Sequence, residues 1–153
     1  MKISDILAPG SVVADLKADG KVEVLKELLD ALAASNPNIN KEHFLTILME
    51  RERLGSTGVG DGVAIPHGKM QGSGQMMAAF GRNKSGIDFQ ALDGKPTTLF
   101  FLLMAPENSA GAHLKALARI SRLLKQESLR TSLLEAEDSE EIYRILVTED
   151  DSA

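Results

Sequence analysis

An uninterrupted run of apolar residues near position 100 constrains the fold of this chain more than any other feature. Residues 97–104 read TTLFFLLM, and the purely apolar stretch lasts from Leu99 to Ala105. A strand with one solvated face alternates apolar and polar residues, whereas a strand covered on both faces is apolar throughout. Thr97 to Met104 is therefore predicted to be a strand buried on both faces. The run is far too short to cross a bilayer.

Helices are predicted on both sides of this strand in the sequence. Apolar residues recur there at spacings of three and four, which is the pattern of an amphipathic helix. The segments are 21–34, about 41–54, 113–125, 128–136 and 139–148. Asn40 is the expected N-cap of the second segment, and Gly55 is expected to end it.

Short strands are predicted between the two groups of helices. A glycine-dense loop, residues 55–62, leads into a strand that ends at Pro66, and Met76 to Phe80 reads as a further strand. Ser85-Gly86 indicates a turn, followed by a short extended piece at 87–89. The order helix, helix, strands, helices predicts a single α/β domain, with a mixed β-sheet sandwiched between helices.

The length of 153 residues fits one domain with a sizeable core. We expect this domain to span residues 1–148. The acidic end, Glu149 to Ala153, contains too little apolar surface to hold it against a core, so it is expected to be a tail.

Composition and motifs argue against several classes of function. The net charge is -5, with one Tyr and no Trp, so no nucleic-acid partner is expected. No two histidines have the spacing that places two ligands on one helical face, and no glycine motif fits a nucleotide site. We therefore expect no metal and no cofactor. The N-terminus does not read as a secretory signal, so we expect a cytoplasmic protein without membrane insertion.

His67 is the first candidate for chemistry because of its immediate neighbours. It follows Pro66, whose φ is fixed, and precedes Gly68, which leaves the backbone bare. A neutral imidazole is a good nucleophile near pH 7, and nearby backbone N–H groups could hold the oxygens of a phosphoryl group. A histidine that merely closes a turn remains an equally good interpretation of these local features.

Arg51 is the second candidate because it lies within an apolar helical stripe. At 100° per residue it points within about 20° of Phe44. An arginine there needs an anion, and its guanidinium suits a phosphoryl group as well as a carboxylate. An ordinary internal ion pair is the alternative.

His113 is the third candidate, although it shares a stripe with Leu117 and Ile120 and could be a satisfied histidine at the margin of the core. It also lies near the start of a helix that follows the buried strand. Ligands collect at that edge of a helix-flanked sheet, and helix N-termini attract anions. His43, which lies off the apolar stripe, is interpreted as a surface residue.

The segment around His67 resembles a known family. Residues 51–60 read RERLGSTGVG and residues 62–69 read GVAIPHGK. This pattern closely resembles the signature of enzyme IIA of the fructose and mannitol class of the bacterial phosphotransferase system, and most of all its nitrogen-regulatory branch. The likeness extends from ISDIL at 3–7, through the buried strand and His113, to EEIY at 140–143.

The resemblance implies roles for these residues. It implies that His67 is the phosphoryl acceptor, that His113 supports the phosphorylated form and that Arg51 contributes charge. The expected donor is a histidine phosphocarrier protein, with phosphoenolpyruvate as the ultimate source. The expected recipients are regulatory target proteins or, in a sugar-specific IIA component of the fructose or mannitol type, a IIB domain. The protein would then be a phosphotransferase component that carries phosphate stoichiometrically.

Two other schemes remain open at this stage. The domain could be a pure binding module whose histidine never turns over. Alternatively, the hydroxyl of Ser56 or Thr57, in the glycine-dense loop, could be the phosphoryl acceptor in place of the imidazole.

Overall fold

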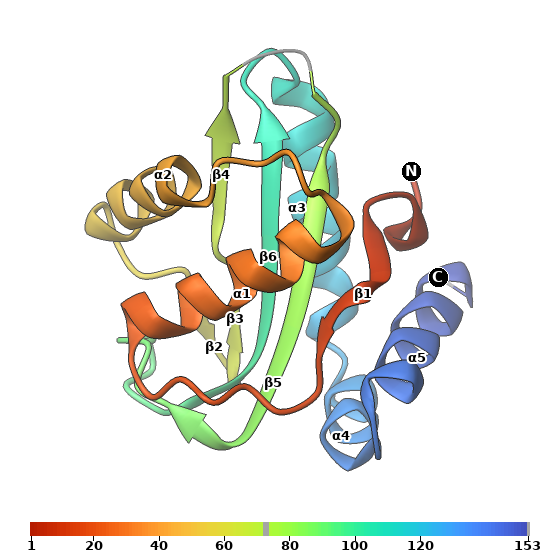
Figure 1. The fold of residues 1–153 in the computed structure, drawn as a ribbon. Coiled ribbons are helices and arrows are strands. Elements are labelled where there is room, and N and C mark those ends of the chain that lie inside the picture. The colour runs from red at the N-terminus through yellow and green to blue at the C-terminus, as the bar shows by residue number, and fades with distance from the viewer. Residues whose placement is uncertain (72–73, 153) are drawn as a thin grey trace.

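The computed structural model describes residues 1–71 and 74–152 and contains a six-stranded sheet (Figure 1). The strands are β1 (Leu7–Val13), β2 (Gly58–Gly60), β3 (Val63–Ala64), β4 (His67–Met70), β5 (Met77–Ile87) and β6 (Thr97–Pro106). Their order is β1-β5-β6-β3-β2, and β4 also pairs with β6. The β1–β5, β3–β6 and β4–β6 pairs are parallel and the other two are antiparallel. The sheet is mixed, as the sequence predicts.

Helices cover both faces of the sheet, which confirms the predicted sandwich. The helical elements are a 3-10 turn, η1 (Ile3–Asp5), and the helices α1 (Lys21–Ser35), α2 (Lys41–Arg53), α3 (Ala110–Leu124), α4 (Glu127–Glu135) and α5 (Ser139–Ser152). Residues of α1 and α2 join one hydrophobic cluster, and residues of α3, α4 and α5 join the other. The Asn40 side chain accepts a hydrogen bond from the backbone N–H of His43, so the predicted N-cap of α2 is present.

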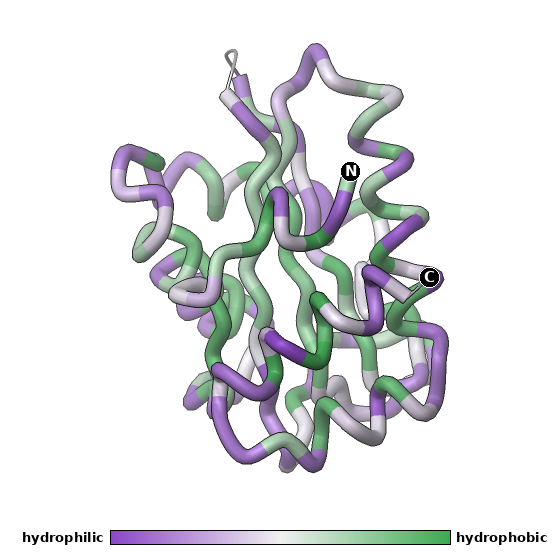
Figure 2. The backbone as a smooth tube through the Cα atoms, turned by 90° about the vertical axis from the view of Figure 1, so that its right-hand side faces the viewer, coloured by the Kyte–Doolittle hydropathy of each residue, from purple (hydrophilic) through white to green (hydrophobic). Residues whose placement is uncertain are grey.

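The central strand β6 separates these two clusters. Leu99, Phe101 and Leu103 face the α3–α5 side, whereas Phe100, Leu102 and Met104 face the α1–α2 side. All six side chains are at most 1% exposed. In Figure 2 the inner strands are accordingly green, and the outer helices alternate between green and purple. The predicted burial of this strand on both faces is confirmed.

The predicted turn at Ser85-Gly86 is wrong, because β5 continues through it to Ile87. The pairing of β5 with β6 instead becomes irregular between Arg82 and Ile87. Gly86 has φ +88°, and a Cβ atom at that position would lie 2.6 Å from Cβ of Pro96. The glycine therefore marks a bulge that lets the strand stay against its neighbour.

Three strands, β1, β2 and β4, have no counterpart in the sequence prediction. β1 contains Pro9 and Gly10, and β2 is the tripeptide Gly-Val-Gly, so neither shows a regular apolar pattern. The predicted strand ending at Pro66 is also shorter, since β3 ends at Ala64 and β4 begins at His67. Both pieces pair with the same edge of β6. The ladder is interrupted at Ile65 and Pro66, and Pro66 has no N–H to donate.

The acidic end of the chain is not the expected free tail within the described residues. Helix α5 continues through Ser152, and Asp150 is 2% exposed. Its carboxylate accepts hydrogen bonds from the backbone N–H of Ile3 and from Arg119. Ala153 lies outside the described residues. None of the helices in the described part of the chain has the length and hydrophobicity of a membrane span.

Candidate functional site

The three candidate residues, which lie far apart in the sequence, line a single surface cavity. Arg51 comes from the last turn of α2, His67 is the first residue of β4, and His113 lies in the first turns of α3. The cavity has a volume of about 480 Å³ and also includes the exposed apolar side chains of Leu54 and Leu114. The cavity therefore combines two imidazoles and a guanidinium with an apolar rim.

Gly68 allows α2 to approach β4 at this point. A Cβ atom on Gly68 would lie 2.5 Å from Cγ2 of Ile47, closer than real Cβ contacts. Any larger residue would therefore push α2 away from the strand. Because Arg51 lies one turn beyond Ile47 on α2, this close packing brings its guanidinium to His67.

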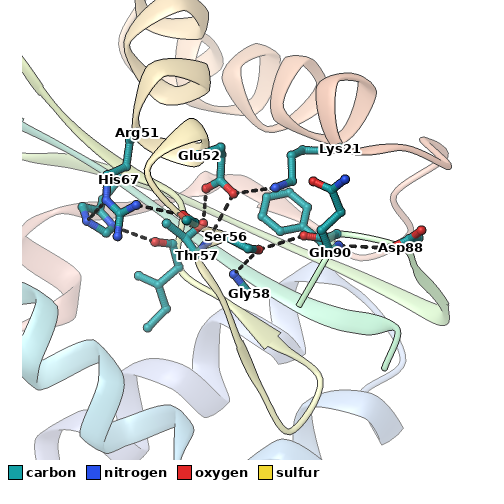
Figure 3. Close-up of polar contacts among 12 residues, drawn as sticks. Lys21, Arg51, Glu52, Ser56, Thr57, Gly58, His67, Asp88 and Gln90 are labelled. Carbon is teal, nitrogen blue, oxygen red and sulfur yellow. Dashed lines mark hydrogen bonds and ion pairs between the residues drawn. The ribbon is translucent and has the colours of Figure 1, made fainter. Parts of the chain in front are cut away.

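The two ring nitrogens of His67 have different partners. Nδ1 lies 2.8 Å from the carbonyl oxygen of Ile65, and Nε2 lies 3.3 Å from Nε of Arg51 (Figure 3). A carbonyl oxygen can only accept and a guanidinium N–H can only donate. We therefore assign the proton to Nδ1, which leaves the lone pair of Nε2 directed toward Arg51.

The surroundings of His67 favour its neutral form. Burial lowers the pKa of this imidazole below its ordinary value of 6.5, and the charge of Arg51 lowers it further. The Ile65 carbonyl and the Glu52 carboxylate act in the opposite direction but do not reverse the shift. At pH 7 His67 is therefore a neutral base.

Arg51 is half-buried and has no acidic partner within the described chain. Its Nη1 donates to the carbonyl oxygen of Gly55 at 2.9 Å, and its Nε donates to His67. None of the ion pairs among residues 1–71 and 74–152 involves its guanidinium. The alternative interpretation of Arg51 as a member of an internal ion pair is therefore wrong.

His113 lies beside His67 and is 4% exposed. The two ring centroids are 5.8 Å apart and the rings meet edge to face at 77°. Burial lowers the pKa of His113, and the neighbouring His67 and Lys69 lower it further. Its Nε2 is buried without a hydrogen-bond partner in the described chain. Buried polar atoms rarely lack a partner, so the satisfied core histidine of the alternative interpretation is not what the structure contains.

None of the residues of the glycine-dense segment 55–62 lines the cavity of His67. Residues 58–64 form the β2–β3 hairpin, and among the residues that the structure describes only Gly68 contributes glycine backbone to the cavity wall. The N–H of Gly58 is already bonded to Ser56 Oγ. His43 is exposed on α2, as expected.

Comparison with known proteins shows which family this chain belongs to. The family described as "Phosphoenolpyruvate-dependent sugar phosphotransferase system, EIIA 2" matches residues 5–148. The chain belongs to this family. It is a IIA-type phosphocarrier, and the resemblance drawn from the residues around His67 is confirmed.

The relatives of this EIIA 2 protein include regulatory and sugar-specific members. It is 42% identical to a nitrogen regulatory protein of Bradyrhizobium diazoefficiens over 95% of both chains. It is 36% identical to the fructose-specific EIIABC component of Bacillus subtilis, over 95% of this chain and 23% of that protein. The crystal structure of nitrogen regulatory protein IIA-Ntr from Neisseria meningitidis matches with a TM-score of 0.87 at 38% identity, covering 94% of this chain and 98% of that one.

The EIIA 2 site also has a buried polar group that sequence reasoning missed. Glu52 lies next to Arg51 on α2, but its carboxylate points to the other side, toward Lys21 and Thr57 (Figure 3). The residue is 7% exposed. The sequence did contain a hint of its importance, because Glu52 lies between two arginines in the segment that resembles the family signature. Helical spacing alone, however, does not predict that Glu52 is buried.

Proposed function

We propose that Nε2 of His67 accepts a phosphoryl group from a phosphorylated histidine phosphocarrier protein, and that the phosphorylated form acts as a regulatory signal. The observation that carries the proposal is the pair of hydrogen bonds on the ring. The Ile65 carbonyl holds the proton on Nδ1, so Nε2 presents a lone pair without first losing a proton. The role of carrier is stoichiometric, because the phosphate stays on the protein until it is passed on.

The transfer step balances on this geometry. The Nε2 lone pair attacks phosphorus, the P–N bond of the donor phosphohistidine breaks, and its electron pair returns to the donor imidazole. His67 becomes positively charged, and its Nδ1–H continues to donate to the Ile65 carbonyl. Phosphoryl transfer asks the protein mainly for such in-line positioning and for charge around the equatorial oxygens.

Arg51 and His113 support this reaction from two sides. The phosphoryl group would take the place now held by Arg51 Nε at Nε2, so the guanidinium would move to the phosphoryl oxygens, which it suits as a donor. The unpartnered Nε2 of His113 would gain a partner when the adjacent imidazole carries this group. No metal or cofactor is needed for this scheme.

The structure disfavours the hydroxyl alternatives. Ser56 Oγ donates to the carbonyl oxygen of Phe89. The Thr57 hydroxyl donates to the Glu52 carboxylate, and the residue is 3% exposed. Both hydroxyls are engaged, and neither residue lines the cavity of His67.

The experiment is to incubate the protein with phosphoenolpyruvate and the upstream phosphocarriers and to follow its intact mass. We expect one added phosphoryl group in the native protein and in the control His43→Ala, and none in a folded His67→Ala variant. The adduct should be lost in acid and survive in alkali, as a P–N bond does. Unchanged labelling of His67→Ala, or an adduct that persists in warm acid, would refute the histidine mechanism. A native protein that takes no phosphate would favour the pure binding module.

The second candidate is a sugar-specific IIA component that passes phosphate to a IIB domain. The likeness to the fructose-specific component of Bacillus subtilis supports it. We place regulation first because the nitrogen regulatory relative matches at higher identity and over 95% of its length, against 23% for the fructose-specific component. A phosphoryl group on His67 would change the charge of this surface by about -1.5 to -2, which is enough to recruit or to repel a docking partner. Rapid transfer from labelled protein to a fructose-type IIB domain would instead support the transport role.

A further inference from the structure

A buried ion pair lies behind the phosphoryl site, outside its cavity. The Nζ of Lys21, the first residue of α1, lies 2.8 Å from Oε1 of Glu52, and the two side chains are 13% and 3% exposed. The same ammonium lies 4.8 Å from the centre of the Phe89 ring. Charged residues are almost never buried to this degree unless they are paired. Because water contributes little to stabilising these two charges, each of them depends on the other and on nearby hydrogen bonds.

The Glu52 carboxylate accepts two further hydrogen bonds, both from Thr57. Its Oε1 also accepts from the backbone N–H of Thr57 at 3.2 Å, and its Oε2 accepts from the Thr57 hydroxyl. One carboxylate thus fixes both the backbone and the side chain of Thr57. Hydrogen bonds to a charged acceptor are about twice as strong as neutral ones, and their strength increases when they are buried.

The segment that Glu52 fixes carries the groups that orient the cavity residues. The carbonyl oxygen of Thr57 accepts from the N–H of Ile65 at 3.0 Å. The carbonyl of Ile65 in turn accepts from Nδ1 of His67 at 2.8 Å. Two residues before Thr57, the carbonyl of Gly55 accepts from Nη1 of Arg51. Figure 3 shows the two ends of this chain of contacts, with Glu52 between Lys21 and Thr57, and Arg51 against His67.

We infer that Glu52, neutralised by Lys21, is a positioning residue for the phosphoryl site. Through Thr57 it holds residues 55–57 so that the Ile65 carbonyl keeps the proton on Nδ1 of His67 and the Gly55 carbonyl keeps Arg51 beside Nε2. Misplacement of reacting groups by about 1 Å can cost on the order of a hundredfold in rate. The inference rests on the proposed role of His67 for its rate effect, but the proton position is independent of it.

The first test is Glu52→Gln, which keeps the shape of the side chain and removes its charge. An amide cannot both accept at two atoms and neutralise Lys21, so the hold on Thr57 weakens. We expect ¹⁵N NMR of the imidazole rings to show proton density shifting from Nδ1 to Nε2 of His67, and phosphoryl acceptance to slow at least tenfold. The matched control is Glu42→Gln, an exposed residue of the same helix, which should stay within twofold of the native protein.

A second pair of variants protects the test against loss of the fold. Thr57→Val removes the hydroxyl that donates to Glu52 while nearly keeping the volume of the side chain. Thr57→Ser retains that hydroxyl. We expect Thr57→Val to change the His67 ring shifts and the acceptance rate in the same direction as Glu52→Gln, and Thr57→Ser to restore both. A merely structural role would lower stability in both Thr57 variants without this rescue.

Native ring shifts and native acceptance rates in folded Glu52→Gln and Thr57→Val would overturn the inference. An unfolded Glu52→Gln combined with native His67 shifts in Thr57→Val would also overturn it, because Glu52 would then serve only the fold. If the native protein takes no phosphate on His67, the proposed function fails. The ring shifts, measured without any donor, would still decide whether Glu52 sets the proton position.

Discussion

At the scale of residues, the candidate site depends on which groups contact the two nitrogens of one imidazole. Ile65 provides an acceptor at Nδ1 of His67, and Arg51 provides a donor at Nε2. Burial then keeps the ring neutral, since it lowers the pKa of His67. Under the proposed function, Nε2 of His67 would therefore have its lone pair available before any partner docks, and Arg51 would supply positive charge beside the phosphoryl group.

We predict that Arg51→Ala slows phosphoryl acceptance by a factor on the order of ten to a thousand, by analogy with removal of one transition-state donor. The charge of Arg51 also lowers the pKa of His67, so its removal raises that pKa. A higher pKa means more protonated, inactive imidazole at a given pH. The rate in the variant should therefore begin to fall at a higher pH as the solution is acidified.

The measurement for Arg51→Ala is the acceptance rate as a function of pH. Arg53→Ala is the matched control, because Arg53 carries the same charge two residues along α2 and is exposed. Its profile should coincide with that of the native protein. A native rate and profile in Arg51→Ala would leave Arg51 without a role in the transfer.

The sequence predicted the members of the cavity better than the network behind them. His67, Arg51 and His113 were found because each breaks a local expectation or matches a family signature. Glu52 was missed because its burial depends on Lys21, a residue 31 positions away on another helix. No local pattern reports a partner at that separation.

At the scale of elements, the buried strand and the helices were predictable, and irregular strands were not. β6 and the helices have a strong apolar pattern, and their order gives the sandwich. β5 was predicted too short because Ser85-Gly86 has the composition of a turn. The chain does not turn there, because β5 pairs with β6 both before Gly86, at Arg82, and after it, at Ile87. The residues between these two positions form a bulge within the strand.

Arg82 on β5 ties helix α4 to the sheet and gives a prediction at this scale. It is 1% exposed, and its Nη1 donates to the carbonyls of Leu133 and Ala136 at the end of α4. Its Nε donates to the carbonyl of Ala14. We expect Arg82→Met to lower the free energy of unfolding by about 3 kcal/mol, because three carbonyls, two of them buried, lose a charged donor.

Urea denaturation would measure the effect of Arg82→Met, with Lys84→Met as the control. Lys84 lies on the same strand but is exposed, so its replacement should change the free energy of unfolding by no more than about 0.5 kcal/mol. Equal unfolding midpoints for the two variants would show that α4 does not depend on Arg82.

At the scale of the whole molecule, the two ends of the chain meet at one buried carboxylate. Asp150 of α5 accepts from the N–H of Ile3 at 2.8 Å and from Nε of Arg119, on α3, at 2.6 Å. Figure 1 shows the N-terminal turn and the end of α5 on the same side of the sheet. Composition made residues 149–153 look like a tail because a run of acidic residues does not reveal a partner at the opposite end of the sequence.

We predict that Asp150→Ala lowers the free energy of unfolding by about 2–4 kcal/mol. The substitution leaves the N–H of Ile3, a residue that is 0% exposed, without an acceptor, and it leaves Arg119 without its carboxylate partner. Asp151→Ala is the control: its residue is exposed and only forms a surface pair with Lys2 at 3.6 Å, so its loss should cost no more than about 1 kcal/mol. Urea denaturation gives the stabilities, and hydrogen exchange at the Ile3 amide reports the contact itself, which should open in Asp150→Ala alone. If both variants unfold at the same urea concentration and the Ile3 amide remains protected in each, the ends of the chain are held by apolar packing of η1 and α5, and Asp150 does not join them.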